Sequence, residues 1–96
     1  MKSDYYVYAI VSLKYSRIYV GISSDIQTRL KYHNSGKVFS TKGYRPWKLF
    51  YKEFIGSRSG ARRREKYLKS GCGKEYLKSF LGSSVGYLPA GRQGAT

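Results

Sequence analysis

Apolar and polar side chains alternate in two stretches near the start of the chain, at residues 5–11 and 17–23. Both stretches are rich in β-branched and aromatic residues, and the segment between them is short enough for a hairpin loop. The pattern predicts two antiparallel strands, each with one apolar face. If those faces lie together over the core, the register of the pair is fixed. The apolar positions concerned are Val7, Ala9, Val11, Ile18, Val20 and Ile22.

The opposite face of this hairpin is predicted to be aromatic. The same register makes Tyr8 of the first strand and Tyr19 of the second near neighbours. Gly21 has no side chain and is expected to leave room beside them for something to approach.

A helix is predicted next, over residues 25–34. Ser24 begins a capping-box pattern at its start, and Gly36 supplies a stop after its end. Within the helix, Arg29 and His33 lie one turn apart, so the two side chains can point at the same place.

The remaining pattern predicts an irregular basic loop, a strand and two helices, at residues 37–45, 47–55, 60–70 and 75–81. The fold class is therefore α+β. We expect a three-stranded antiparallel sheet flanked by helices, in the order β-β-α-β-α-α.

Only one compact domain is expected in a chain of 96 residues. We place it at residues 1–81. From residue 82 to 96 the periodicity is lost and glycine is frequent, which is typical of a flexible C-terminal tail.

The second predicted helix carries a carboxylate on its apolar stripe. Glu65 falls in line with Ala61, Leu68 and Cys72, on a helix whose other positions are mostly Lys and Arg. A buried carboxylate is costly unless it is paired or bound to a metal. From the pattern alone, the simpler interpretation is an ion pair with Lys69, one turn later. Cys72 is expected to be a small buried apolar residue.

Charge narrows the choice of partner. The 19 Lys and Arg residues oppose 5 Asp and Glu residues, for a formal net charge of +14 at pH 7. A folded domain tolerates this self-repulsion more easily when its partner is a polyanion, and nucleic acid is the leading candidate. A ribosome-associated protein or an anionic membrane surface fits the same charge. Those alternatives predict disordered basic runs or an amphipathic basic helix, so no membrane partner is expected.

Several kinds of site are excluded by composition. One cysteine rules out an internal disulfide framework, and one histidine rules out histidine-rich metal sites. No zinc-ligand spacing, P-loop or Gly-x-Gly-x-x-Gly pattern occurs. The N-terminus lacks the apolar run of a signal peptide, so a cytoplasmic location is expected by default.

The order and spacing of five polar residues resemble those of the GIY-YIG nuclease superfamily, in particular its small single-domain members related to the incision subunit of bacterial nucleotide-excision repair. The residues are Tyr8, Tyr19, Arg29, His33 and Glu65. The two family tripeptides correspond to Tyr6-Val7-Tyr8 and Tyr19-Val20-Gly21. The resemblance covers about residues 5–81.

The resemblance implies a role for each of the five residues. Glu65 would bind one divalent cation, Mg²⁺ or Mn²⁺, with water and phosphate completing an oxygen shell. Arg29 would donate to a phosphate oxygen. Tyr8 or Tyr19 would take a proton from the attacking water, with Tyr8 preferred, and nearby positive charge would lower the phenol pKa. His33 would assist or serve as the base itself.

Further cations are expected to form a track for the phosphates of nucleic acid. Runs of charge are often only solvated faces of a protein, so each of these residues has that alternative. They are Lys37, Lys42, Arg45, Lys48, Arg62 and Arg63.

The function implied by the resemblance is a metal-dependent endonuclease that hydrolyses DNA phosphodiester bonds in repair or recombination, with DNA favoured over RNA. The alternative is a nucleic-acid-binding module of the same fold that cleaves poorly or not at all. It remains open because many family nucleases carry an asparagine in the C-terminal third, whereas Asn34 is the only asparagine of this chain. A protein-interaction domain is a third possibility, but it leaves the charge unexplained.

Overall fold

The structure is a computed structural model that describes residues 4–82 of the chain. Its elements follow the order β-β-α-β-α-α, which confirms the predicted α+β class. They are β1 (Tyr5–Ser12), β2 (Ile18–Ser23), α1 (Ile26–Ser35), the short 3-10 helix η1 (Lys42–Tyr44), β3 (Trp47–Gly56), α2 (Arg58–Lys69) and α3 (Gly71–Gly82). The predicted tail, except for residue 82, lies outside the described residues.

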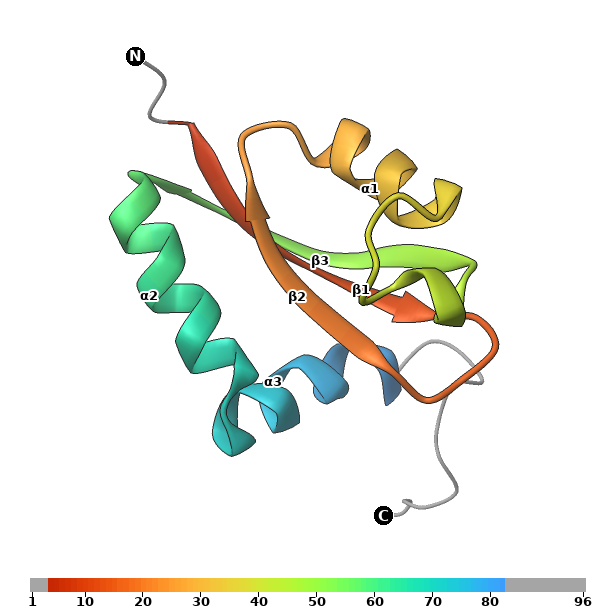
Figure 1. The fold of residues 1–96 in the computed structure, drawn as a ribbon. Helices are drawn as coiled ribbons and strands as arrows, with labels where there is room; N and C mark the ends of the chain where they lie inside the picture. The colour runs from red at the N-terminus through yellow and green to blue at the C-terminus, as the bar shows by residue number, and fades with distance from the viewer. Residues whose placement is uncertain (1–3, 83–96) are drawn as a thin grey trace.

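The three strands form one antiparallel sheet in the order β2-β1-β3, with β1 at its centre (Figure 1). Ala9 pairs with Val20, and Val7 pairs with Ile22. This is the register that the apolar alternation predicts. It follows because a shift by one residue would turn each apolar set to the wrong face.

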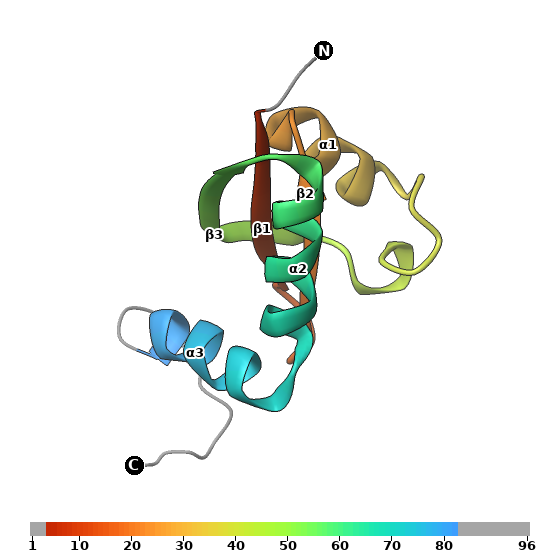
Figure 2. The same cartoon turned by 90° about the vertical axis from the view of Figure 1, so that its left-hand side faces the viewer.

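Helices cover both faces of the sheet. On one face α2 and α3 enclose an apolar cluster that includes Val7, Ala9 and Leu68. On the other face α1 lies over a second cluster that includes Tyr8 and Trp47, so β1 is buried on both sides (Figure 2). None of the helices in residues 4–82 is long and apolar enough to span a membrane.

The start of α1 differs from the prediction by one residue. Asp25, not Ser24, is the N-cap, and its side chain accepts a hydrogen bond from the Thr28 backbone N–H. Asp25 also suits the partial positive charge at a helix N-terminus. The predicted stop is confirmed, because Gly36 has a positive φ of 87° and closes the helix.

The junction between α2 and α3 was not predicted correctly. A third helix was expected to begin near residue 75, but α3 begins at Gly71. The hydroxyl of Ser70, just before this helix, accepts a hydrogen bond from the Gly73 N–H in its first turn. The new helix changes the direction of the side chains that follow. Cys72 is therefore exposed, and its predicted place on the buried stripe of α2 is wrong.

Gly73 lets the two helices approach closely, because a Cβ there would collide with the backbone of Tyr67 and Leu68. Gly73→Ala should therefore lower the free energy of unfolding by about 1–3 kcal/mol, since backbone atoms must move apart. Gly71→Ala is the matched control, because a Cβ at Gly71 meets nothing within 4 Å. Urea unfolding of both variants tests this. Equal effects of the two changes would contradict the close approach at Gly73.

Candidate active site

Tyr8 lies at the centre of the sheet and points toward α1. It pairs with Gly21 of β2 and is completely buried. A Cβ built on Gly21 would lie 2.8 Å from the Tyr8 hydroxyl oxygen and 3.1 Å from a ring carbon of Tyr19. The space that Gly21 leaves is thus filled by the Tyr8 side chain. It is not open to a ligand, contrary to what the sequence had suggested.

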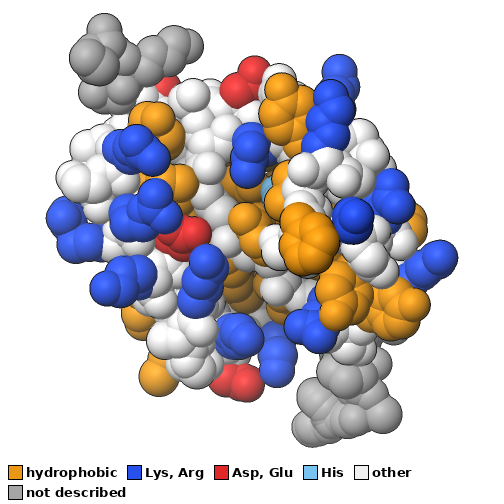
Figure 3. Space-filling view, in the orientation of Figure 1, with side chains coloured by type: hydrophobic (Ala, Val, Ile, Leu, Met, Phe, Trp, Pro, Cys, Tyr) orange, Lys and Arg blue, Asp and Glu red, His pale blue; other side chains and the backbone are white. Residues whose placement is uncertain are grey.

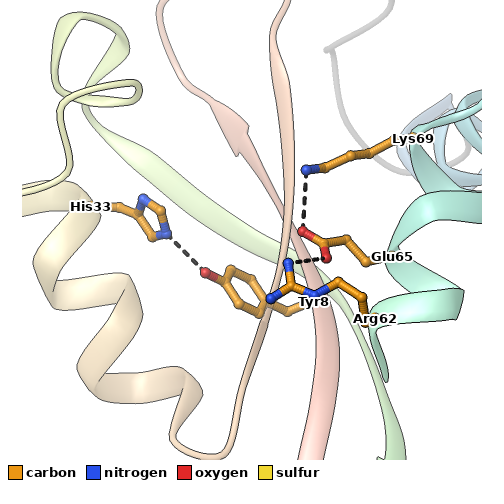
Figure 4. Close-up of polar contacts among 5 residues, drawn as sticks. All are labelled: Tyr8, His33, Arg62, Glu65 and Lys69. Carbon is orange, nitrogen blue, oxygen red and sulfur yellow. Dashed lines mark hydrogen bonds and ion pairs between the residues drawn. The ribbon is translucent and has the colours of Figure 1, made fainter. Parts of the chain in front are cut away.

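A chain of hydrogen bonds leads from Tyr8 into α1 and the loop that follows it. The Tyr8 hydroxyl lies 2.9 Å from His33 Nε2 (Figure 4), and His33 Nδ1 lies 2.9 Å from Thr41 Oγ1. The Thr41 hydroxyl in turn donates to the carbonyl of Val38 over 3.3 Å. His33 is completely buried and Thr41 almost so. Thr41 was not among the predicted site residues, and nothing in its local sequence distinguishes it from other loop threonines.

Burial and the charge of Arg29 set the protonation of this pair. Burial raises the pKa of Tyr8 to about 12, although hydrogen bonding by the Arg29 guanidinium acts in the opposite direction. Burial also lowers the pKa of His33 from 6.5 to about 4, and the positive charge of Arg29 adds to that effect. Both side chains are therefore neutral at pH 7.

Tyr19 is the tyrosine at the surface of this group. It is partly exposed, and its ring centroid lies 4.7 Å from that of His33 and 6.5 Å from that of Tyr8. The predicted neighbourhood of the two tyrosines is thus present in the structure. Only Tyr19 can meet solvent without a rearrangement.

Arg29 holds an unsatisfied hydrogen-bond donor. Its Nε is the one buried side-chain nitrogen or oxygen without a hydrogen-bond partner in residues 4–82. The guanidinium carbon lies 5.9 Å from the centre of the Tyr32 ring, and its charge acts on both Tyr8 and His33. An unpaired buried donor is costly, so this nitrogen is a position where an anionic oxygen would be stabilised.

Glu65 lies on α2, which packs against the other face of the sheet. Only 7% of its surface is exposed. Its carboxylate binds Lys69 Nζ at 3.1 Å and an Arg62 guanidinium nitrogen at 3.3 Å, so the ion pair suggested by the sequence is present (Figure 4). No hydrogen bond joins Glu65 to the tyrosines, Arg29 or His33 within the described residues. Its negative charge nevertheless contributes to the raised pKa of Tyr8, so the two groups are within electrostatic reach.

The chemistry of Glu65 fits a hard divalent cation. In residues 4–82 no three His, Cys, Asp or Glu side chains are grouped so that they could hold a metal ion. Mg²⁺ keeps several of its waters and is often held by one or two carboxylates together with substrate phosphates. Glu65 is a nearly buried carboxylate that already attracts two cationic side chains. An incoming cation would have to compete with Lys69 and Arg62 for its oxygens.

The cations of the loop after α1 lie beside exposed aromatic rings. Lys37 Nζ is 5.3 Å from the centre of the Tyr32 ring, which Arg29 also approaches. Lys42 Nζ is 5.3 Å from the ring of Phe39, a residue that is 83% exposed. Lys37 and Arg29 thus both lie near the same aromatic ring, that of Tyr32.

The other predicted cations are placed differently. Arg45 Nε donates a hydrogen bond to the carbonyl of Lys42 over 2.7 Å, which stabilises the loop. Lys48 pairs with Val11 across the sheet, which puts its side chain on the face opposite Tyr8. Arg62 binds Glu65, and Arg63 is exposed on α2. Lys and Arg side chains are spread widely over the face seen in Figure 3, which shows few acidic ones.

Protonation of His33 should destabilise the fold in mild acid. Folding lowers the pKa of His33 from about 6.5 in the unfolded chain to about 4. The contribution of neutral His33 to stability is therefore complete above pH 6.5 and is lost as the pH falls toward 4. The free energy of unfolding should decrease by about 3 kcal/mol across this window. Urea unfolding at a series of pH values measures it. His33→Gln should flatten the profile, and a wild-type stability that stays constant through the window would contradict the buried neutral imidazole.

Comparison with known proteins identifies the family. The family model for the GIY-YIG catalytic domain matches residues 4–76. The UPF0213 protein of Staphylococcus haemolyticus is 39% identical over 77 residues, which cover 79% of this chain and 93% of that protein. The UPF0213 protein of Bacillus licheniformis is 32% identical over 94 residues, or 94% of this chain and 97% of that protein.

One solved structure is also similar. It is the solution NMR structure of the UPF0213 protein BH0048 from Bacillus halodurans, which is 32% identical, covers 83% of this chain and 87% of that chain, and has a TM-score of 0.49. The names of these relatives state no activity. The family model spans most of the chain and all five residues on which the resemblance was based, and the chain therefore belongs to the GIY-YIG catalytic domain family, a family of nucleases.

Proposed function

We propose that this protein is a metal-dependent endonuclease that hydrolyses phosphodiester bonds of DNA. The observation that carries the proposal is the unpaired Nε of Arg29 beside the Tyr8–His33 pair. Family membership supports nucleic-acid binding, and the net charge of +14 favours a polyanion over a neutral substrate.

Arg29 is the residue that would bind the phosphate. A guanidinium has several donors in a rigid fork, which suits the oxygens of a phosphodiester. Its Nε is buried and has no partner in the described residues, so a small shift of the Arg29 side chain would be needed before a phosphate oxygen could satisfy this donor. Lys37, which also lies against the Tyr32 ring, would hold a neighbouring phosphate.

Tyr19 is the better placed of the two tyrosines to meet the attacking water. Tyr8 is completely buried, its hydroxyl is bonded to His33, and burial raises its pKa to about 12. The pKa of His33 is about 4, so moving the Tyr8 proton to His33 is strongly uphill. We therefore assign contact with the attacking water to Tyr19. Tyr8 and His33 would instead hold Tyr19 and Arg29 in position.

Glu65 would hold the divalent cation, Mg²⁺ or Mn²⁺, in a shell completed by water and phosphate oxygens. When bound, such a cation neutralises charge on the phosphate and on the departing oxygen. Lys69 and Arg62 contact the Glu65 carboxylate at 3.1 and 3.3 Å. Both lie on the exposed side of α2, where they can turn away to solvent when a cation takes their place.

The reaction is a hydrolysis in which all atoms come from water and DNA. The water oxygen forms a new bond to phosphorus, and its proton passes to the Tyr19 oxygen while the phenol hydrogen of Tyr19 passes to solvent water. The bond between phosphorus and the 3′ oxygen breaks, and that oxygen takes a proton. The products are a 5′-phosphate and a 3′-hydroxyl, the ends that the family resemblance implies.

Cleavage assays with site variants test the proposal. Wild-type protein should cut plain, nicked or branched DNA only when Mg²⁺ or Mn²⁺ is added. Glu65→Gln and Arg29→Ala should each lower the rate by at least about 100-fold, because each removes charge stabilisation at the reacting phosphate. The matched controls are Glu75→Gln, a carboxylate 78% exposed on α3, and Arg58→Ala at the exposed start of α2. Both controls should cut like the wild type.

Two other outcomes have distinct meanings. Salt-sensitive DNA binding by all variants, without cleavage by any, would favour the alternative of a binding module. Equal cleavage by wild type, Glu65→Gln and Arg29→Ala would show that the activity comes from another site or protein.

A further inference from the structure

Thr41 has no chemical role among the predicted site residues or in the proposed reaction, yet it is one of the most deeply buried polar residues of the fold, with only 1% of its surface exposed. Its side chain contacts His33 Nδ1 at 2.9 Å. Its backbone carbonyl accepts a hydrogen bond from the indole N–H of Trp47 at 2.9 Å. Thr41 is therefore held from both sides, and its hydroxyl is presented to the imidazole in a fixed position.

The hydrogen bonds of Thr41 favour one tautomer of His33. The Thr41 hydroxyl carries a single hydrogen, and the Val38 carbonyl accepts it over 3.3 Å, a long contact. With its hydrogen used in this way, the hydroxyl oxygen accepts from His33, which favours the imidazole hydrogen on Nδ1. Nε2 is left with a free lone pair that faces Tyr8.

The surroundings of Tyr8 point independently to the same tautomer. If Nε2 carried the hydrogen and donated to Tyr8, the hydroxyl hydrogen of Tyr8 would need a different acceptor. Arg29, which also lies within hydrogen-bonding reach of Tyr8, has only donors and cannot accept that hydrogen. His33 is the hydrogen-bond partner of the Tyr8 hydroxyl in the described part of the chain. A buried hydroxyl without an acceptor is costly, so the Tyr8 hydrogen must go to Nε2.

We propose that Thr41 is a positioning residue, whose hydroxyl holds His33 in the Nδ1–H tautomer and thereby directs the Tyr8 hydrogen to Nε2. The Tyr8 oxygen then turns its lone pairs toward the Arg29 guanidinium. Arg29 is thus held by an acceptor and keeps its unpaired Nε for the phosphate. The catalytic part of this inference rests on the proposed function, whereas the tautomer assignment does not.

The nitrogen NMR signals of His33 test the assignment directly. His33 is the only histidine of the chain, so selective ¹⁵N labelling of histidine reports on a single imidazole. A protonated ring nitrogen and a bare one differ widely in chemical shift. Wild-type protein at neutral pH should show a protonated Nδ1 and a bare Nε2. Thr41→Ser keeps the hydroxyl and should show the same pattern.

Thr41→Val removes the hydroxyl at nearly constant volume and should shift the population toward the Nε2–H tautomer, because Nδ1–H would lose its acceptor. The inference is overturned if wild-type His33 carries its hydrogen on Nε2, or if Thr41→Val leaves the Nδ1–H population unchanged. The wild-type and Thr41→Ser spectra decide the question even if Thr41→Val does not fold.

Cleavage kinetics separate this inference from the proposed function. Thr41→Val should lower kcat about tenfold with little change in KM, because a supporting residue acts through the groups it orients. Thr41→Ser should restore kcat. A wild-type kcat retained by Thr41→Val would overturn the catalytic part. If the wild type itself cuts no DNA while the tautomer shifts as expected, the proposed function fails and the assignment of Thr41 stands.

Discussion

The hydrogen bond between Tyr8 and His33 ties the two halves of the site together. Tyr8 comes from the central strand and His33 from α1, and at 2.9 Å their contact fixes the helix on the sheet at that point. The bond depends on strand register, since Tyr8 faces α1 only because Val7 and Ala9 face the other core. It also depends on Gly21, whose missing side chain leaves the space that the Tyr8 hydroxyl fills. Apolar alternation along one hairpin thereby decides where a polar network can form.

The two charged residues of the proposed site come from helices that pack on opposite faces of the sheet. Arg29 on α1 presents an unpaired donor, while Glu65 on α2 collects Arg62 and Lys69. In a chain with a net charge of +14, a nearly buried carboxylate is a local exception. To act on one phosphodiester, Arg29 and a cation at Glu65 would have to meet around the edge strand β2, and the effect of the Glu65 charge on Tyr8 is consistent with such proximity. Lys48 lies on the face opposite Tyr8, whereas Lys37 and Lys42 follow α1 in the chain.

Much of this arrangement could be predicted from the sequence because it follows from periodicity. The pairing of Val7 with Ile22, the inward turn of Glu65 and the stop at Gly36 all follow from local pattern and backbone freedom. What the sequence could not show depends on contacts between distant segments. Thr41 reaches His33 only because the loop folds back over α1, and α3 begins at Gly71 only because two helices approach closely there. The burial of Tyr8 could not be predicted either. It raises the pKa of Tyr8, which is why the proposal gives contact with the water to Tyr19.

The most direct test of this account is a double-mutant cycle on Tyr8 and His33. Tyr8→Phe, His33→Leu and the double variant are unfolded in urea, and the destabilisation of the double variant is compared with the sum of the single effects. If the buried hydrogen bond joins sheet and helix as described, the two residues should be coupled by at least about 1 kcal/mol. Additive effects to within about 0.3 kcal/mol would contradict the account, because the two side chains would then contribute independently and the site would have no common anchor.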